Sequence, residues 1–97
     1  MNDENRDDFS QLVDKLIATA NQQLEHSDCG LVTSALVAAS ARFAAFYAAS
    51  SSESKKDLSQ DKNDIVQHLG GEFKRCLAED VQDYIDNYKI YMKDRDA

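Results

Sequence analysis

The chain contains no proline and only three glycines in 97 residues. A small β-rich domain needs several tight turns, and such turns draw mainly on glycine and proline. Helical domains need few of them, so this composition predicts an all-α fold. A chain of this length accommodates one domain, and we therefore expect residues 1–97 to form a single helical domain.

Acidic residues outnumber basic ones, since 18 Asp and Glu stand against 11 Lys and Arg, for a net charge of −7. Affinity for nucleic acid depends largely on the neutralisation of phosphates, and docking onto anionic lipid also needs positive charge. We therefore expect neither nucleic acid nor a membrane as a partner. A basic protein partner is compatible with this charge.

The first predicted helix spans residues 8–28. Its apolar residues recur at i, i+3, i+4 and i+7, which is typical of an amphipathic helix. Asp7 or Asp8 can cap the start of this helix, and Gly30 marks its end. The polar residues 1–6 are expected to fray.

The second predicted helix spans residues 31–50, with Asp28 as its N-cap. It is unusual because neither face is polar, and such a helix is normally buried on most sides. We therefore expect it to be the alanine-rich central helix of the fold. Its bulky face carries Val32, Leu36, Ala39, Phe43, Phe46 and Tyr47, and its small face carries Ser34, Ala38, Ala41, Ala45 and Ala48.

The third predicted helix spans residues 60–92 and follows a serine-rich connection of about a dozen residues, with Ser59 or Asp61 as its cap. It would be ~50 Å long, against ~30 Å for each of the others. Either it breaks at Gly70-Gly71, or it stays whole, straight or kinked, and its overhang packs on a second copy. We favour the whole helix, because no convincing N-cap follows the glycines. The expected fold is a three-helix bundle.

The predicted location is the cytoplasm. The first five residues lack the basic start and apolar run of a signal peptide. Two cysteines, Cys29 and Cys76, do not make a disulfide framework, so we expect free thiols in a reducing compartment. The stretch 31–51 is long enough to span a bilayer, but it is mostly Ala and Ser and holds Arg42 near its centre. We expect no membrane span.

Arg42 is the single charged residue of the central helix and lies at the border of its bulky face. A charge among apolar neighbours needs a carboxylate or several carbonyls nearby, so a structural ion pair is the first interpretation. The alternative is an anion or ligand contact, which suits the guanidinium. Candidate partners for an ion pair are Asp14, Glu72, Asp80 and Asp83.

Two further surfaces lie near the C-terminus. Three tyrosines share a helical stripe, and tyrosine is enriched at binding surfaces, so this stripe is a candidate interface as well as ordinary packing. An acidic run on the same helix is a candidate patch for a basic partner, although a solvated face is the simpler interpretation. The stripe is Tyr84, Tyr88 and Tyr91, and the patch is Glu79, Asp80, Asp83 and Asp86.

The sequence predicts no metal, cofactor or catalytic residue. His26 and Cys29 have the spacing of zinc ligands, but His68 and Cys76 lie eight residues apart, ~12 Å along one helix, and cannot share an ion. Gly70-Gly71 lacks the spacing and the lysine of a phosphate-binding loop. No paired nucleophile and base can be argued, so enzymatic activity is unsupported.

Two stretches resemble a known family. These are Ala41-Arg42-Phe43-Ala44-Ala45-Phe46 and Asp83-Tyr84-Ile85-Asp86-Asn87-Tyr88. They are similar to an uncharacterised bacterial family, domain of unknown function thirty-one forty-four. Ala44 stands where that family tends to have asparagine, which removes a polar group there. The resemblance implies a cytoplasmic bacterial protein and no particular activity.

Together these features predict a non-enzymatic helical module that binds protein and self-associates as a homodimer through its C-terminal helix. One alternative is a small-ligand or anion binder that uses Arg42. Another is an acidic adaptor for a basic protein.

Overall fold

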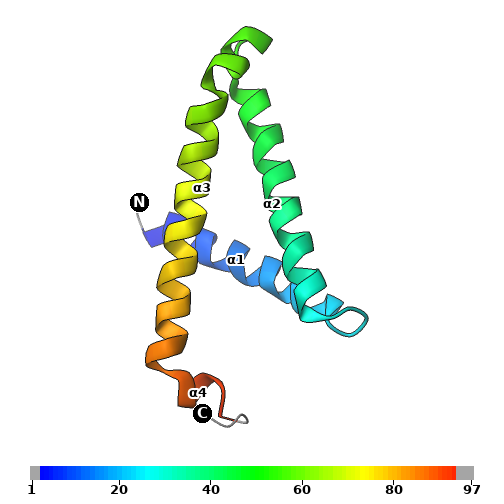
Figure 1. Ribbon diagram of the computed structural model, residues 1–97, viewed down its shortest axis with the longest axis vertical. Helices are drawn as coiled ribbons and strands as arrows, with labels where there is room; N and C mark the ends of the chain where they lie inside the picture. Colours follow the sequence, from blue (N-terminus) through cyan, green and yellow to red (C-terminus); the bar gives the residue numbers. More distant parts are fainter. Residues whose placement is uncertain (1–2, 94–97) are drawn as a thin grey trace. The chain divides into compact units, whose positions relative to one another are not determined.

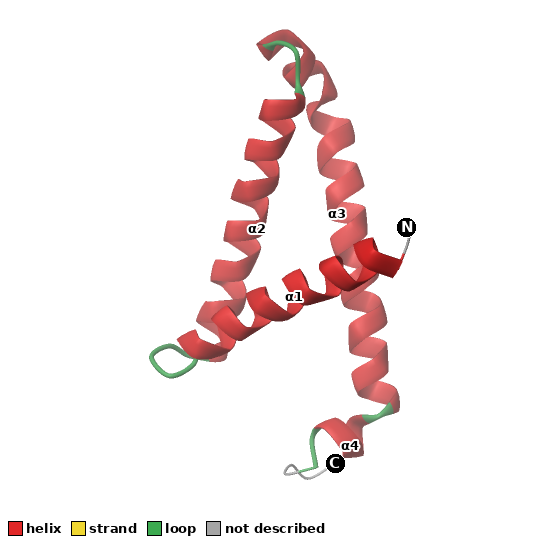
Figure 2. Ribbon diagram, turned by 180° about the vertical axis from the view of Figure 1, so that it is seen from behind, coloured by secondary structure: helices red, strands yellow, loops and turns green. Residues whose placement is uncertain are grey.

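The structure is a computed structural model that describes the backbone of residues 3–93 and the side chains of residues 5–93. Residues 3–93 form four helices, which Figure 1 labels in chain order, and these residues include no strand (Figure 2). The all-α class is therefore confirmed, and the three long helices are consistent with the predicted bundle. The helices are α1 (Asp3–Gln23), α2 (Cys29–Ser51), α3 (Lys55–Asp86) and α4 (Tyr88–Tyr91).

The chain divides into two units, Met1–Tyr47 and Ala48–Ala97. Within the first unit, α1 and α2 make no helix-to-helix contact, whereas α3 and α4 pack on each other within the second. No described side chain is buried. Each unit therefore carries an apolar surface that its own elements leave uncovered.

The helix α1 begins and ends about five residues earlier than the sequence predicts. It starts at Asp3, so the expected cap at Asp7 or Asp8 is wrong, and residues 3–6 are helical. Neither proline nor glycine stands between residues 3 and 8, so nothing stops the helix from extending. Residues 1 and 2 lie outside the described residues.

The chain leaves α1 through a tight turn after Gln23. Backbone hydrogen bonds of the i to i−3 type join Leu24 N to Asn21 O (3.1 Å) and His26 N to Gln23 O (3.0 Å). Such bonds satisfy the last carbonyls of a helix while ending it. Gly30, the expected stop signal, instead lies in the first turn of α2.

Asp28 caps α2, as predicted. Its Oδ1 atom accepts a hydrogen bond from the backbone N–H of Leu31 at 2.8 Å, and its carbonyl oxygen accepts one from Val32. This pattern satisfies amide donors that a helix start leaves free. The bulky face of α2 is exposed in its own unit, and Phe43 is the most exposed large apolar residue described, at 73%. The expected burial of α2 is thus not achieved within its unit.

The helix α3 begins at Lys55, well before the predicted start near residue 60. Its N-cap is Ser54, whose Oγ accepts a hydrogen bond from Asp57 N at 3.1 Å, so the expected caps Ser59 and Asp61 are wrong. Asp57 also places a negative charge in the first turn, where the helix dipole favours it. The predicted dozen-residue connection is only three residues long, from Ser52 to Ser54.

The helix α3 continues unbroken through Gly70-Gly71, in agreement with the favoured alternative. Glycine costs about 1 kcal/mol per residue in a helix interior relative to alanine. The many better helix formers in the flanking turns offset this cost. Nothing lies within 4 Å of a Cβ placed at either glycine. The 32 residues of α3 correspond to a length of ~48 Å.

The predicted helix does not reach residue 92 as one piece. It stops at Asp86, and Asn87 separates it from the single turn of α4. Asn87 has φ −119° and ψ 31°, far from helical values. Figure 1 shows α4 turned away from the axis of α3. We call this junction the α3–α4 bend.

Candidate interaction surface

The end of α3 and all of α4, residues 78–93, form a surface that we call the C-terminal tip. It carries large apolar residues that are 38–71% exposed, with Ile90 the most exposed and Tyr88 the least. The three predicted tyrosines all lie here. These exposed residues are Val81, Tyr84, Ile85, Tyr88, Ile90 and Tyr91.

The bend divides the tyrosine stripe. The ring of Tyr91 lies against that of Tyr84, with centroids 4.6 Å apart and planes inclined by 42°. In a straight helix, residues seven apart are separated by ~10 Å along the axis, so the bend creates this contact. Tyr88 has no ring contact among the described residues. The tip therefore presents a ring pair and a separate tyrosine.

Asp83 is the centre of the contacts that hold the bend. Its Oδ2 atom accepts a hydrogen bond from the Tyr91 hydroxyl at 2.8 Å, and its Oδ1 atom accepts one from Asn87 Nδ2 at 2.9 Å. The Asp83 carbonyl oxygen also accepts a bond from the Asn87 backbone N–H at 3.0 Å, which is the ordinary i to i−4 bond that closes the last turn of α3. One residue thus joins the last turn of α3 to α4.

The environment of Tyr91 stabilises its neutral form. The hydrogen bond to Asp83, together with the negative charge of that carboxylate, raises the pKa of Tyr91 above its ordinary value. Ionisation would remove the donated proton and place two negative charges side by side. The contact therefore depends on the phenol remaining protonated.

A shallow hollow lies at the bend. It is open to solvent, and it combines apolar side chains with the charged Asp86 and Lys89. Its lining residues are Ile85, Asp86, Asn87, Tyr88, Lys89 and Ile90. The hollow is formed by the same residues that change direction between the two helices.

Three of the four carboxylates of the predicted acidic patch already have partners within the same unit, on α3, at Asn87 or on α4. Glu79 pairs with Arg75, Asp83 binds Asn87 and Tyr91, and Asp86 Oδ1 accepts a hydrogen bond from Gln82 at 2.9 Å. Asp80 makes no such contact among the described residues. These internal contacts leave less of the patch available to a basic partner, and its role stays a prediction.

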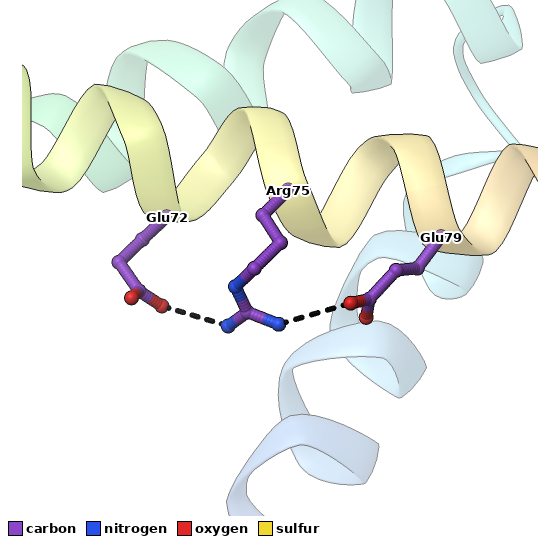
Figure 3. A network of polar contacts seen from close by, with 3 residues as sticks. All are labelled: Glu72, Arg75 and Glu79. Carbon is purple, nitrogen blue, oxygen red and sulfur yellow. Dashed lines mark hydrogen bonds and ion pairs between the residues drawn. The ribbon is translucent and has the colours of Figure 1, made fainter.

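Arg75 bridges two acidic residues on one side of α3 (Figure 3). Its guanidinium lies 3.0 Å from Glu72 and 3.2 Å from Glu79. The hydrogen bond and charge of Glu72, followed by the bond to Glu79, raise the pKa of Arg75. All three residues are exposed, so this network supports the helix locally rather than forming a site.

Arg42 is exposed and forms no ion pair among the described residues. Of its candidate partners, Glu72 is paired with Arg75, and Asp83 accepts bonds from Asn87 and Tyr91. That leaves Asp14 and Asp80 as candidates without a competing contact among residues 5–93. The predicted ion pair and the alternative anion contact both stay predictions.

The histidines and cysteines form no cluster with the acidic residues that the structure describes. Within residues 3–93, no group of three or more His, Cys, Asp and Glu side chains is placed to hold a metal ion. Cys29 and Cys76 are free and exposed.

By length and composition alone, α2 is long and apolar enough to cross a membrane, with a mean hydropathy of 1.5. A buried core helix of a soluble protein has the same length and composition, but only 6% of this stretch is buried in the structure. The expectation of no membrane span therefore stays a prediction.

Two features of the site were missed at the level of sequence. The first is the bend, whose signal is Asp86-Asn87, two residues of low helix propensity inside an apolar periodicity. The second is the Glu72-Arg75-Glu79 network, whose signal is the i, i+3 and i, i+4 spacing of opposite charges.

The fold and the exposed tip define a small acidic helical protein with an uncovered aromatic surface. A family model described as Protein of unknown function (DUF3144) matches residues 9–85, more than half of the chain. The chain therefore belongs to this family, which confirms the resemblance in the sequence. Comparison with curated proteins and with solved structures found no match.

Proposed function

We propose that this protein is a non-enzymatic helical interaction module that self-associates through its C-terminal tip, with Tyr84, Tyr88 and Tyr91 in the contact. The partner is a second copy of the chain. The observation that carries this proposal is the length of α3. The proposed setting is the cytoplasm, where the exposed free thiols of Cys29 and Cys76 suit a reducing environment.

The helix lengths limit how much of α3 one chain can cover. The helix α2 has 23 residues and α1 has 21, against 32 in α3. In a bundle of the three long helices, α2 can therefore cover at most 23 of the 32 residues of α3, and α1 at most 21. The remaining length of α3 is ~14 Å. We place it at the C-terminal tip, because only three residues connect α2 to the start of α3.

The tip carries apolar side chains that the chain's own elements leave exposed to water. Its large apolar side chains include Ile85 at 61% exposure and Ile90 at 71%. Exposed apolar side chains of this kind support an interaction site, since burial of tyrosine and isoleucine drives association. A second copy offers an identical, equally uncovered tip, which a two-fold symmetric contact requires.

The test is the solution mass of the full chain, measured by sedimentation or light scattering over a range of concentrations. We expect a mass approaching twice 10.9 kDa. Ile85→Glu should yield a single-chain mass, because it places a charge in the contact. Gln67→Glu is the control, since it makes the same charge change on α3 outside the tip.

A single-chain mass for the unaltered protein at every concentration would contradict self-association. An unchanged dimer in Ile85→Glu would place the contact elsewhere on the surface. Circular dichroism of both variants confirms that they remain helical.

A second candidate function, anion binding through Arg42, is favoured by the exposure of that side chain and by its lack of an ion pair among the described residues. A thermal-shift screen with phosphate and sulfate tests it. Stabilisation that disappears in Arg42→Gln supports the role, and stabilisation that persists in this variant rules it out.

A further inference from the structure

We propose that the α3–α4 bend is a two-state element of this chain, with Asp83 holding it in the bent state and a continuous helix as the alternative. The inference concerns the conformation of one chain, so it stands whether or not the protein self-associates. Its consequence is that Asp83 decides which aromatic surface the C-terminal tip presents.

The bent state depends on contacts that span the junction. Tyr91 lies eight residues after Asp83, and in a straight helix this spacing corresponds to ~12 Å along the axis. The hydroxyl of Tyr91 nevertheless lies 2.8 Å from Asp83 Oδ2. The same carboxylate binds the Asn87 side chain at 2.9 Å, at the residue where the backbone leaves helical geometry. The Asn87 bond joins residues four apart and is also compatible with a straight helix, so the bond from Tyr91 is the one that requires the bend.

The straight state is compatible with the sequence. Residues 84–93 contain neither proline nor glycine, so nothing prevents the backbone bonds of α3 from continuing. Asn87 is a poor helix former but not a helix breaker. The apolar periodicity also continues through the junction, since Tyr84, Tyr88 and Tyr91 keep i, i+4 and i+7 spacing. The straight helix is therefore a specific alternative to the bent conformation.

The contacts that hold the bend are exposed and few. Tyr84 is 51% and Tyr91 47% exposed, so their ring pair and the hydrogen bond to Asp83 compete directly with water. Hydrogen bonds in such positions contribute little net stability. The loss of a single contact is therefore enough to shift the population from the bent toward the straight state. A buried junction, held by more contacts, would tolerate the loss.

The two states present different surfaces. In the bent state Tyr91 packs on Tyr84, and the hollow lined by Ile85, Tyr88 and Ile90 is present. In the straight state the three tyrosines would form one continuous stripe, because positions i, i+4 and i+7 share a helical face. A partner that binds one of these surfaces would shift the population toward it.

The experiment measures a distance across the bend by spin labelling of the full chain. Cys76 carries one label and Lys93→Cys the other, in a background with Cys29→Ser. Dilution with excess unlabelled chain restricts the signal to distances within one molecule. A straight helix places the two backbone positions ~25 Å apart.

We expect a shorter distance in the starting protein and a population shift toward ~25 Å in both Tyr91→Phe and Asp83→Ala. Tyr91→Phe keeps the ring and removes only the donor, so it isolates the hydrogen bond. Tyr88→Phe is the matched control and should leave the distribution unchanged. A starting protein already at ~25 Å, identical distributions in all variants, or an equal shift in Tyr88→Phe would overturn the proposal.

Discussion

The rings of Tyr84 and Tyr91 lie with their centroids 4.6 Å apart, although seven residues separate them in the chain. This contact exists because the helix stops at Asp86 and resumes after Asn87 in a new direction. The hydrogen bond from Tyr91 to Asp83 completes the arrangement. The C-terminal tip is therefore shaped by a break that interrupts an otherwise regular apolar stripe.

The contact between Tyr91 and Asp83 should make the free energy of unfolding decrease at alkaline pH. The pKa of Tyr91 is raised in the folded chain, so its stabilising contribution is fully present below the unfolded pKa of ~10 and is lost as pH rises through the folded value. The stability difference between the starting protein and Tyr91→Phe should thus be constant near neutral pH and shrink at high pH. Denaturation at a series of pH values measures it.

The control for this prediction is Tyr88→Phe, which leaves the Asp83 contact intact and should retain the alkaline loss. A difference between the starting protein and Tyr91→Phe that grows with pH would show that the hydrogen bond does not control the titration.

Loss of the Ser54 side chain should lower the stability of the protein more than loss of Ser59, which the sequence suggested as a cap. Ser54→Ala removes the acceptor of the Asp57 N–H bond, and loss of an N-cap costs about 1 kcal/mol. Ser59→Ala lies inside α3 and should be neutral or slightly stabilising, since alanine is the better helix former. Chemical denaturation compares the two variants, and a larger loss in Ser59→Ala would place the helix start where the sequence predicts it.

Alanine at Gly70 or Gly71 should stabilise the protein by about 1 kcal/mol each, because both glycines are helical and a Cβ there meets nothing within 4 Å. Gly30→Ala should gain less, since its Cβ would lie 3.3 Å from Asp28 Oδ1. Denaturation midpoints test this. A loss of stability in Gly70→Ala would instead reveal a surface that packs closely on this part of α3 in the assembled protein.

The network around Arg75 should contribute weakly and in a salt-dependent way. Arg75→Gln removes the contacts with Glu72 and Glu79, and it should lower the thermal midpoint slightly at low ionic strength. The difference should vanish near 1 M salt, where charges are screened within a few ångströms. Lys74→Gln makes the same charge change without losing an ion pair among the described residues. An effect of Arg75→Gln that persists in high salt would indicate a tertiary role.

Much of the local structure could be predicted from sequence. The lack of proline and the scarcity of glycine predicted the all-α class, and the cap at Asp28 followed from its position before an apolar run. The continuation of α3 through Gly70-Gly71 followed from the absence of a new cap. These features depend on neighbours within one or two turns, and such neighbours are readable from the chain itself.

The ends of the helices and the structure of the C-terminal tip could not be predicted as well from the sequence. Ser54 was overlooked because it lies in a serine-rich run and the regular apolar spacing of α3 begins only at Ile65, well after the helix itself. The bend was missed because Tyr84, Ile85, Tyr88 and Met92 keep helical spacing straight through it.

The sequence by itself determined the helical class, the three long helices and the concentration of tyrosines near the C-terminus, because backbone propensity and apolar periodicity are local properties. Only the tertiary structure decided that Tyr91 returns to Tyr84 and that Asp83 joins the two helices at the bend. The physical reason is that residues eight apart lie ~12 Å from each other along a straight helix. The Tyr91 hydroxyl can therefore reach Asp83 only after the chain has turned. The periodicity alone gives no sign of that turn.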